Sequence, residues 1–569
     1  MRYLLIVFSL LLLTIAPLTA QNDAKELDSI IKKFEDHKPF KRLEHPLGLY
    51  TKAHYQKEAK FARDLLEQLN RLGVSTLSES QQISTALLKY DLRHTVKSYE
   101  YEAYLNPLLS DAGFHLSLNY HIRNLNNYEQ VKAYLNKLNA IPEYVDQHFA
   151  LLREGLEKGI TQPLVIFKGY ENTYDSQIVD DYKESYFYKP FEDLPSTLTE
   201  QQKDSVRKAA KTVITRNVIP EFRRIKKFFE TEYFPQTRKS LGASQLPKGE
   251  EYYDYLLEYY TTLDMSADEV HELGLSEVER INSEMKKVMA ETGFEGSFPE
   301  FFDYLRTDER FYAETPEELL MIARDIAKRI DARLPAFFTK LPRKPYGVAE
   351  VPEAIAPKYT TGRYIGASNE TEPGYYWVNT YDLPSRPLYV LPSLTAHEAV
   401  PGHHLQISLN NELGDSIPEF RRNFYISAFG EGWGLYSEFL AEEMGIYRNL
   451  YEIFGKLTYE QWRACRLVVD TGIHAKGWTR EQAVEFMKKN TALSIHEINT
   501  EVDRYISWPG QAVSYKIGEL KIRQLRKKAE QALGASFDIR KFHEVILEEG
   551  VVTLPILEKR VMAYIQNES

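Results

Sequence analysis

Hydrophobic residues recur at three- and four-residue intervals along most of the chain, a spacing that predicts amphipathic helices. We expect helices over residues 58–72, 128–158, 205–233, 267–289, 316–332, 418–444, 481–489 and 518–533. Two helix starts are well marked. Ser266 and Glu269 have capping-box spacing, and Pro418 stands in a first turn, where its missing N–H costs nothing. The strongest strand signal is the aromatic and β-branched run 375–380. The predicted fold class is mostly α, with a small β element.

The length of the chain indicates more than one lobe. It has 569 residues, and a single compact core stops growing at roughly 250–300 residues. We therefore expect a large multi-helical, two-lobed body with a central cleft. The stretch 242–249, which contains Pro and Gly, is a candidate hinge. It separates an N-terminal helical region, residues 21–246, from a second region, residues 247–569, in which the candidate chemistry gathers.

Charge and cysteine content exclude several classes of partner and site. The chain has 71 Lys and Arg against 82 Asp and Glu, a net charge of -11. Binding to phosphate backbones needs clustered basic residues, so we expect no nucleic acid partner. Cys465 is the only cysteine, which excludes an intramolecular disulfide and a Cys-based zinc site. Any bound metal must be held by His, Asp or Glu.

The first 20 residues have the pattern of a signal peptide. Arg2 precedes the apolar run 4–16, and Ala20 stands before a polar stretch. The run is shorter than the roughly 20 residues that a permanent transmembrane helix needs, although an uncleaved anchor is the alternative. No second long apolar run follows. We expect a periplasmic or secreted protein without a stable membrane span once residues 1–20 are removed.

The candidate chemistry concentrates between His397 and Glu438. His397 directly precedes Glu398, and His403 and His404 follow six and seven positions after His397. Zinc binds imidazole and carboxylate ligands, and a catalytic zinc keeps one position for water. In a His-Glu-x-x-His helix the two His bind the metal and the Glu is the general base. The spacing here is longer.

Two geometries are compatible with this longer spacing. In a regular helix His404 returns to the face of His397, but two turns away along the axis. Alternatively, Pro401 and Gly402 form an insertion that bulges the helix, so that His403 becomes the second ligand. We favour His403, which leaves His404 as a supporting or substrate contact. The structural alternative is that all three His are polar core residues beside a helix break.

Glu431 is the candidate third ligand. Three Gly, at positions 430, 432 and 434, surround it within a predicted helix, although each costs roughly 1 kcal/mol relative to Ala. Small residues let a neighbouring backbone approach closely, as a carboxylate reaching a shared metal requires. Glu438 lies two turns along the same face and is a candidate partner for a ligating His. The alternative is helix packing through small residues, with Glu431 merely solvated.

These residues carry a family resemblance. The motifs are His-Glu-x-x-Pro-Gly-His-His-x-Gln from His397, Glu-Gly-Trp-x-x-Tyr from Glu431, Asp470-Thr471-Gly472-Ile473-His474, and Trp508-Pro509-Gly510-Gln511 with the residues that follow. Together with an upstream motif that begins at Glu269, they resemble the bacterial domain-of-unknown-function family 885 over most of the chain. That family is similar to mostly helical zincin metallopeptidases. The resemblance implies a zincin-like catalytic region, with His397, a neighbouring His and Glu431 as zinc ligands and Glu398 as base.

Four downstream residues are candidates for substrate contacts. The hydroxyl of Tyr515 is a suitable oxyanion donor, and packing is its alternative role. His474 is expected to contact substrate or to be an internally bonded core His. Arg504 and Tyr505 are candidates to bind a substrate carboxylate. The alternative role of Arg504 is a structural ion pair with a neighbouring acidic residue. The strand 375–380 is a candidate for edge pairing with an extended peptide, or else a small structural hairpin.

These observations predict an exported zinc-dependent peptidase. Glu398 would act as general base on the attacking water, and Tyr515 would stabilise the oxyanion. The expected cofactor is Zn²⁺ and the expected partner is a peptide. Two alternatives remain: a zinc hydrolase of non-peptide amides or esters, and a non-catalytic metal-binding envelope protein.

Overall fold

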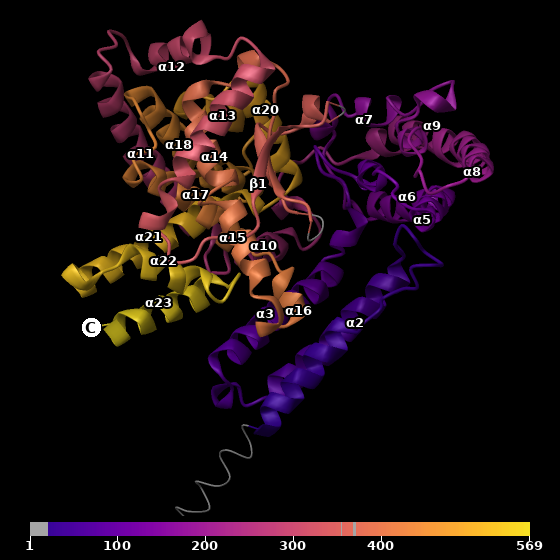
Figure 1. Ribbon diagram of the computed structural model, residues 1–569, viewed down its shortest axis with the longest axis horizontal. Coiled ribbons are helices and arrows are strands. Elements are labelled where there is room, and N and C mark those ends of the chain that lie inside the picture. Colours follow the sequence, from indigo (N-terminus) through magenta and orange to yellow (C-terminus); the bar gives the residue numbers. More distant parts are fainter. Residues whose placement is uncertain (1–20, 354, 368–370, 569) are drawn as a thin grey trace, which may run out of the picture.

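The computed structural model describes residues 21–353, 355–367 and 371–568, and the fold is mostly helical, as predicted (Figure 1). The proposed signal peptide, residues 1–20, lies outside the described residues. Residues 21–35 are helical, and the α-helices that follow are α2 (Lys52–Arg71), α3 (Glu79–Glu100), α4 (Phe114–Ser117), α5 (Tyr128–Asn139), α6 (Ile141–Lys158), α7 (Asn172–Asp175), α8 (Glu200–Val213), α9 (Ile219–Phe228), α10 (Gly249–Thr261), α11 (Ala267–Glu291), α12 (Phe298–Thr307), α13 (Pro316–Asp331), α14 (Leu391–Glu398), α15 (His403–Glu412), α16 (Glu419–Arg422), α17 (Ser427–Glu443), α18 (Leu450–His474), α19 (Arg480–Asn490), α20 (Ile495–Ser507), α21 (Ser514–Leu533), α22 (Ile539–Leu547) and α23 (Leu554–Glu568).

Most of the predicted helices are present, with interruptions where proline stands inside the pattern. The stretch 128–158 forms α5 and α6, because Pro142 belongs to the first turn of a new helix. The stretch 205–233 is helical but contains two widened π turns, at residues 214–218 and 229–233. The capping box of Ser266 and Glu269 opens α11 as expected.

The predicted helix over residues 418–444 is wrong in its first third. Pro418 has an extended backbone outside the helix, and α16 covers only four residues before the chain breaks at Asn423. The second helix, α17, begins at Ser427. The break matters for the site, because it turns the side chain of Tyr425 toward α17.

The β element is a three-stranded sheet in the order β1-β3-β2, made of β1 (Tyr346–Glu350), β2 (Gly362–Ile365) and β3 (Gly374–Val378). Strand β3 is the predicted one, and it pairs in parallel with β1 and antiparallel with β2. The expectation that this strand adds an extended peptide to its edge is wrong, because both of its edges are already paired. The strands at the two margins of the sheet are β1 and β2.

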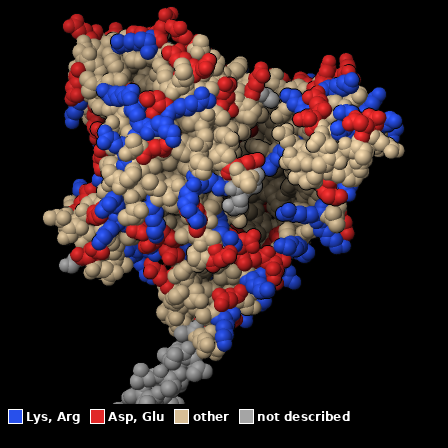
Figure 2. All heavy atoms as spheres, viewed as in Figure 1, with Lys and Arg blue, Asp and Glu red and all other residues tan. Residues whose placement is uncertain are grey.

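The helices form a large body and a smaller lobe (Figure 1). The body contains the sheet and the C-terminal half of the chain, and the smaller lobe contains α5 to α9. A third part, α2 with α3, has its own apolar cluster. Figure 2 shows a hollow between the body and the smaller lobe. One continuous apolar core nevertheless runs from Leu47 to Ile565, across the proposed boundary between residues 246 and 247.

Helix α18 is the central element of the body. All but its first turn is buried, and it packs along α11 and against α14, α17 and α21. Helices α17 and α21 also pack closely on each other. The segments that carry the candidate site residues are therefore held on several sides. Among the described residues, no helix combines the length and the apolarity needed to cross a membrane.

Candidate metal centre

His397, His403 and Glu431 come together from three helices. Each offers one ligand atom, and these atoms lie within 4.8 Å of one another. The Nε2 atoms of His397 and His403 are each 3.4 Å from the same carboxylate oxygen, Oε2 of Glu431. All three side chains are largely buried. Two imidazole nitrogens and one carboxylate oxygen are the donor set of a three-ligand catalytic zinc site, so the residues present fit that metal.

The Pro-Gly insertion brings His403 to His397. Helix α14 ends at Glu398 and α15 begins at His403, while the N–H of Gly402 donates to the carbonyl of Ala396 at 3.0 Å. This bond spans six residues instead of four, so the turn is widened without losing its hydrogen bonding. A Cβ atom at Gly402 would lie 1.9 Å from the carbonyl oxygen of His397. Only glycine fits there, and the bulged geometry is the one that the structure adopts.

Glycines also position Glu431 and His397. A Cβ atom at Gly432 would lie 2.6 Å from Cα of Gly518, so the backbones of α17 and α21 touch at this point. A Cβ atom at Gly434 would lie 2.6 Å from Nε2 of His397. The absent side chains therefore allow the close helix packing and leave the space that the imidazole ring fills.

A buried carboxylate orients the ring of His397. Nδ1 of His397 lies 2.8 Å from Oε1 of Glu438, which is 1% exposed and also lies 3.3 Å from the guanidinium of Arg463. A carboxylate can only accept here, so Nδ1 carries the proton and Nε2 faces His403 and Glu431. The sequence predicted this partner for a ligating His.

The cluster has the electrostatics of a site that favours a cation. Burial alone would lower the pKa of His397, but hydrogen bonds to Glu431 and Glu438 raise it to about 10. Burial alone would raise the pKa of Glu431, but His403 and His397 hold it well below its usual value. Glu431 therefore stays ionised in the interior because the positive charge of the two imidazoles lies beside it.

Glu398 lies beside the cluster and is held by the sheet. Its Oε2 atom accepts the backbone N–H of Tyr364 in β2 at 2.7 Å. The carboxylate contributes to the raised pKa of His397, which places the two groups within electrostatic reach of each other. One carboxylate oxygen is thus fixed by the backbone of β2, one of the two marginal strands.

Two tyrosines flank the cluster. The ring of Tyr515 lies nearly parallel to that of His397, with centroids 6.5 Å apart, and the guanidinium of Arg466 lies 4.3 Å from the Tyr515 centroid. The hydroxyl of Tyr425 donates to Oε1 of Glu431 at 2.8 Å, which leaves Oε2 for the two His. Sequence reasoning missed Tyr425, because it was assigned to a continuous helix. The only signal in the sequence is its nearness to Glu431.

His404 is not brought to the cluster. Its Nδ1 lies 3.0 Å from the hydroxyl of Tyr364, and its Nε2 lies 3.1 Å from the carbonyl oxygen of Lys344. Burial lowers its pKa to about 4, so the ring is neutral near pH 7. His404 therefore links α15 to the sheet instead of supplying the second ligand. Its partner Tyr364 is the residue whose N–H binds Glu398.

His474 and Tyr505 are core residues, and the expectation that they contact substrate is corrected. His474 is fully buried, its Nδ1 accepts the N–H of Ala243, and its Nε2 donates to the carbonyl of Tyr505. The hydroxyl of Tyr505 accepts from Trp462 and Arg466. Their polar atoms are thus engaged inside the protein.

Arg504 lies closer to the cluster but is largely committed to its neighbours. Its guanidinium donates to the amide oxygen of Gln511 at 2.8 Å and lies 3.5 Å from the carboxylate of Glu501. Burial alone would lower its pKa, but Tyr515 and Glu501 raise it well above the usual value. Arg504 therefore supports Tyr515, and the structural ion pair with Glu501 is present.

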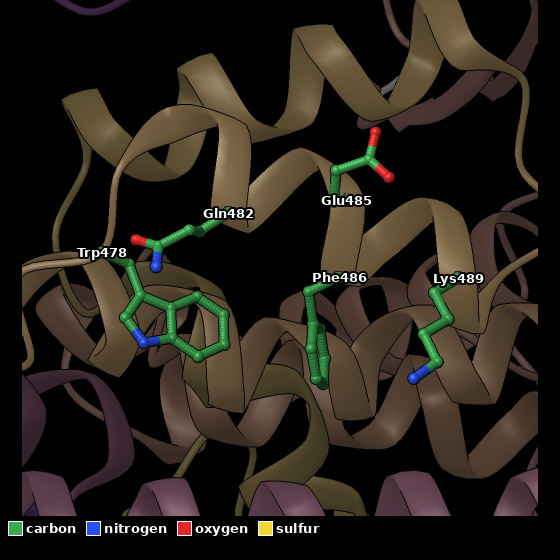
Figure 3. Close-up of a pocket in the computed structure, with 5 residues that line it drawn as sticks. All are labelled: Trp478, Gln482, Glu485, Phe486 and Lys489. Carbon is green, nitrogen blue, oxygen red and sulfur yellow. The ribbon is translucent and has the colours of Figure 1, made fainter.

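The body also carries a shallow surface pocket. It is lined by Trp478, Gln482, Glu485, Phe486 and Lys489, around α19 (Figure 3). None of these residues belongs to the cluster of His397, His403 and Glu431.

Two solved structures are similar to this chain over most of its length. One is described as the "putative lipoprotein" from Colwellia psychrerythraea, with 27% identity, a TM-score of 0.82, and coverage of 91% of this chain and 92% of that chain. The other is described as a "putative lipoprotein of unknown function" from Shewanella oneidensis, with 18% identity, a TM-score of 0.68, and coverage of 95% and 98%, respectively. The second likeness concerns the fold alone. No curated protein matches the chain. Residues 37–561 match the family of bacterial proteins of unknown function DUF885, and the chain belongs to this family.

Proposed function

We propose that the protein is a zinc-dependent peptidase with a zincin-like catalytic region. The proposal is carried by one observation, the convergence of the ligand atoms of His397, His403 and Glu431 within 4.8 Å. The position of Glu398, directly after one proposed ligand and hydrogen-bonded to Tyr364, adds a reason to regard the site as catalytic. A closed structural metal site needs no adjacent base.

Zinc bound there would lower the pKa of a coordinated water and polarise the substrate carbonyl. Glu398 would take the proton of the attacking water and return it to the leaving amine. Tyr515 would donate its hydroxyl proton in a hydrogen bond to the oxygen on which charge develops, a contribution of roughly 3 kcal/mol in comparable sites. Glu438 would keep Nδ1 of His397 protonated so that Nε2 remains a ligand.

We further propose that the protein acts in the bacterial envelope. The apolar N-terminal run supports export, and the similar structure from Colwellia psychrerythraea is described as a putative lipoprotein. An enzyme there would meet peptides outside the cytoplasm.

The proposal is tested with two substitutions and their matched controls. Glu398→Gln should retain zinc and lose turnover on a mixed peptide library, whereas His397→Ala should lose the metal. The controls are Glu443→Gln, which alters a surface pair with Arg526, and His496→Ala, which alters an exposed His. Metal content is measured by mass spectrometry of the purified protein, and products are identified by peptide mass.

The outcomes separate the proposed function from its alternatives. Full activity of Glu398→Gln or full metal content of His397→Ala would contradict the proposal. Metal retention with hydrolysis of esters or non-peptide amides, but not of peptides, would make the protein a different zinc hydrolase. A bound metal with four protein ligands and no hydrolysis would make it a metal-binding protein.

A further inference from the structure

Arg363 stands out on the strand that holds Glu398. It directly precedes Tyr364, and neighbouring residues of a strand point to opposite faces. Tyr364 is buried, and its N–H binds Glu398, whereas Arg363 is exposed. In β2, the backbone of Tyr364 therefore binds the candidate base Glu398, and the side chain of the preceding residue, Arg363, is exposed to solvent.

Other guanidinium groups near the cluster have acidic partners. Arg466 lies 2.9 Å from the carboxylate of Glu501, and Arg504 lies 3.5 Å from the same group. Arg363 makes no ion pair with any acidic side chain in the described part of the chain. Its guanidinium instead lies over the ring of Tyr359, 5.6 Å from the centroid. An aromatic face orients a guanidinium without neutralising its charge.

The strand geometry places Arg363 next to the residue that holds Glu398, and the electrostatics agree with this position. Burial alone would lower its pKa, but Tyr359, Glu398 and Tyr515 raise it, and the nearby Arg504 opposes them. These groups belong to the sheet region, α14, α20 and α21. Arg363 is thus one residue from the backbone N–H that holds Glu398, its charge is within electrostatic reach of Glu398 and Tyr515, and its side chain is exposed. Figure 2 shows charged side chains of both signs around the hollow beside the body.

We propose that Arg363 binds a carboxylate of the peptide substrate. A guanidinium forks onto a carboxylate through two parallel hydrogen bonds, and an exposed Arg held over an aromatic ring is suited to do so. This inference rests on the proposed peptidase function and narrows it. The preferred substrates are peptides with a free C-terminal carboxylate or an acidic side chain a short distance beyond the scissile bond.

The experiment compares two pools of N-acetylated tetrapeptides, one with free C-terminal acids and one with C-terminal amides. Both pools contain Asp, Asn, Glu and Gln at the last two positions, so the α-carboxylate and the acidic side chain are distinguished. Zinc-loaded wild type should cleave its preferred carboxylate-bearing peptides with KM about 10- to 100-fold below that of the matched uncharged ones. Arg363→Gln should erase this difference by raising the KM of the carboxylate-bearing peptides.

Two further variants test whether the two parallel hydrogen-bond donors of the Arg363 guanidinium are needed. Arg363→Lys keeps the charge but not the two parallel donors, so it should recover only part of the preference. Arg540→Gln changes an exposed Arg that pairs with Asp538 on α22, and it should leave the preference intact. The thermal unfolding midpoint should be the same in all these variants, because both Arg side chains are exposed.

A binding measurement makes the proposal independent of turnover. Equilibrium dialysis of both pools against zinc-loaded Glu398→Gln protein should enrich carboxylate-bearing peptides, and adding Arg363→Gln should abolish the enrichment. Enrichment without hydrolysis by wild type would contradict the proposed function and support the carboxylate site. Equal binding of both pools, no binding of either, or a preference that survives Arg363→Gln would overturn the assignment of Arg363.

Discussion

Replacing Glu438 with Gln should weaken zinc binding. Oε1 of Glu438 lies 2.8 Å from Nδ1 of His397, and the side chain is 2% exposed, so solvent does not replace the lost charge. Gln can still accept a hydrogen bond but no longer stabilises the imidazole as a charged partner does. Loss of such a supporting carboxylate costs about 10- to 100-fold in metal affinity, which corresponds to roughly 1.4–2.8 kcal/mol.

The same carboxylate has a second partner, which supplies the control. The guanidinium of Arg463 lies 3.3 Å from Glu438 and is itself 5% exposed. Arg463→Lys keeps a positive charge beside Glu438 and leaves the contact with His397 in place. This variant should change the zinc dissociation constant by less than about threefold. It therefore reports how much of any loss arises from disturbed packing of α18 against α17.

The assay is competition for zinc between the protein and a chromophoric chelator at pH 7.5, with helix content followed by circular dichroism. The expected result is a weaker dissociation constant for Glu438→Gln at unchanged helix content. An unchanged dissociation constant would refute the role given to Glu438. Equal losses in Glu438→Gln and Arg463→Lys would show that packing, and not the carboxylate, sets the affinity.

Three further predictions concern the surroundings of the site. Gly434→Ala should lower zinc content without unfolding the protein, because the added methyl lies 2.6 Å from the His397 ring; normal metal content would contradict this. Lys516→Met should reduce the free energy of unfolding in urea by about 3–5 kcal/mol, because three carboxylates lie within 3.1 Å of the fully buried ammonium and would lose their counter-charge. A change below about 1 kcal/mol would show that other groups compensate these carboxylates. Burial lowers the pKa of His474 to about 3 from an ordinary value of 6.5. As pH falls below 6.5, His474 is therefore protonated in the unfolded chain but not in the folded one, and the folded state loses stability. At pH 5 this loss is about 2 kcal/mol, and His474→Asn should show a correspondingly smaller difference in urea unfolding between pH 7 and pH 5.

The helical character of the chain follows from local patterns, and their failures have local causes. Periodicity alone runs across residue 140 and across residue 423, where the chain breaks. A break that preserves the apolar spacing is not visible in the spacing itself. The central place of β3 in the sheet also cannot be predicted from its own residues, because the pairing depends on β1 and β2.

The candidate site was partly predictable because its residue types are scarce and closely spaced. His397, Glu398 and Glu431 stand out as sequence motifs. Because of the Pro-Gly insertion, the sequence did not decide whether His403 or His404 is the second ligand. Tyr425 and Arg363 were missed because their places depend on a helix break and on a strand margin. His474 belongs to an equally conspicuous motif, yet its ring nitrogens are bonded inside the core. A motif therefore indicates that a residue has a role but does not distinguish a structural role from a chemical one.

The most direct test of the proposed centre is anomalous diffraction at the zinc edge from crystals of the zinc-loaded protein. We expect one zinc among the three helices, about 2.0–2.2 Å from Nε2 of His397, Nε2 of His403 and a carboxylate oxygen of Glu431, with an open fourth position. A zinc bound through His404, or no zinc at this cluster, would contradict this expectation.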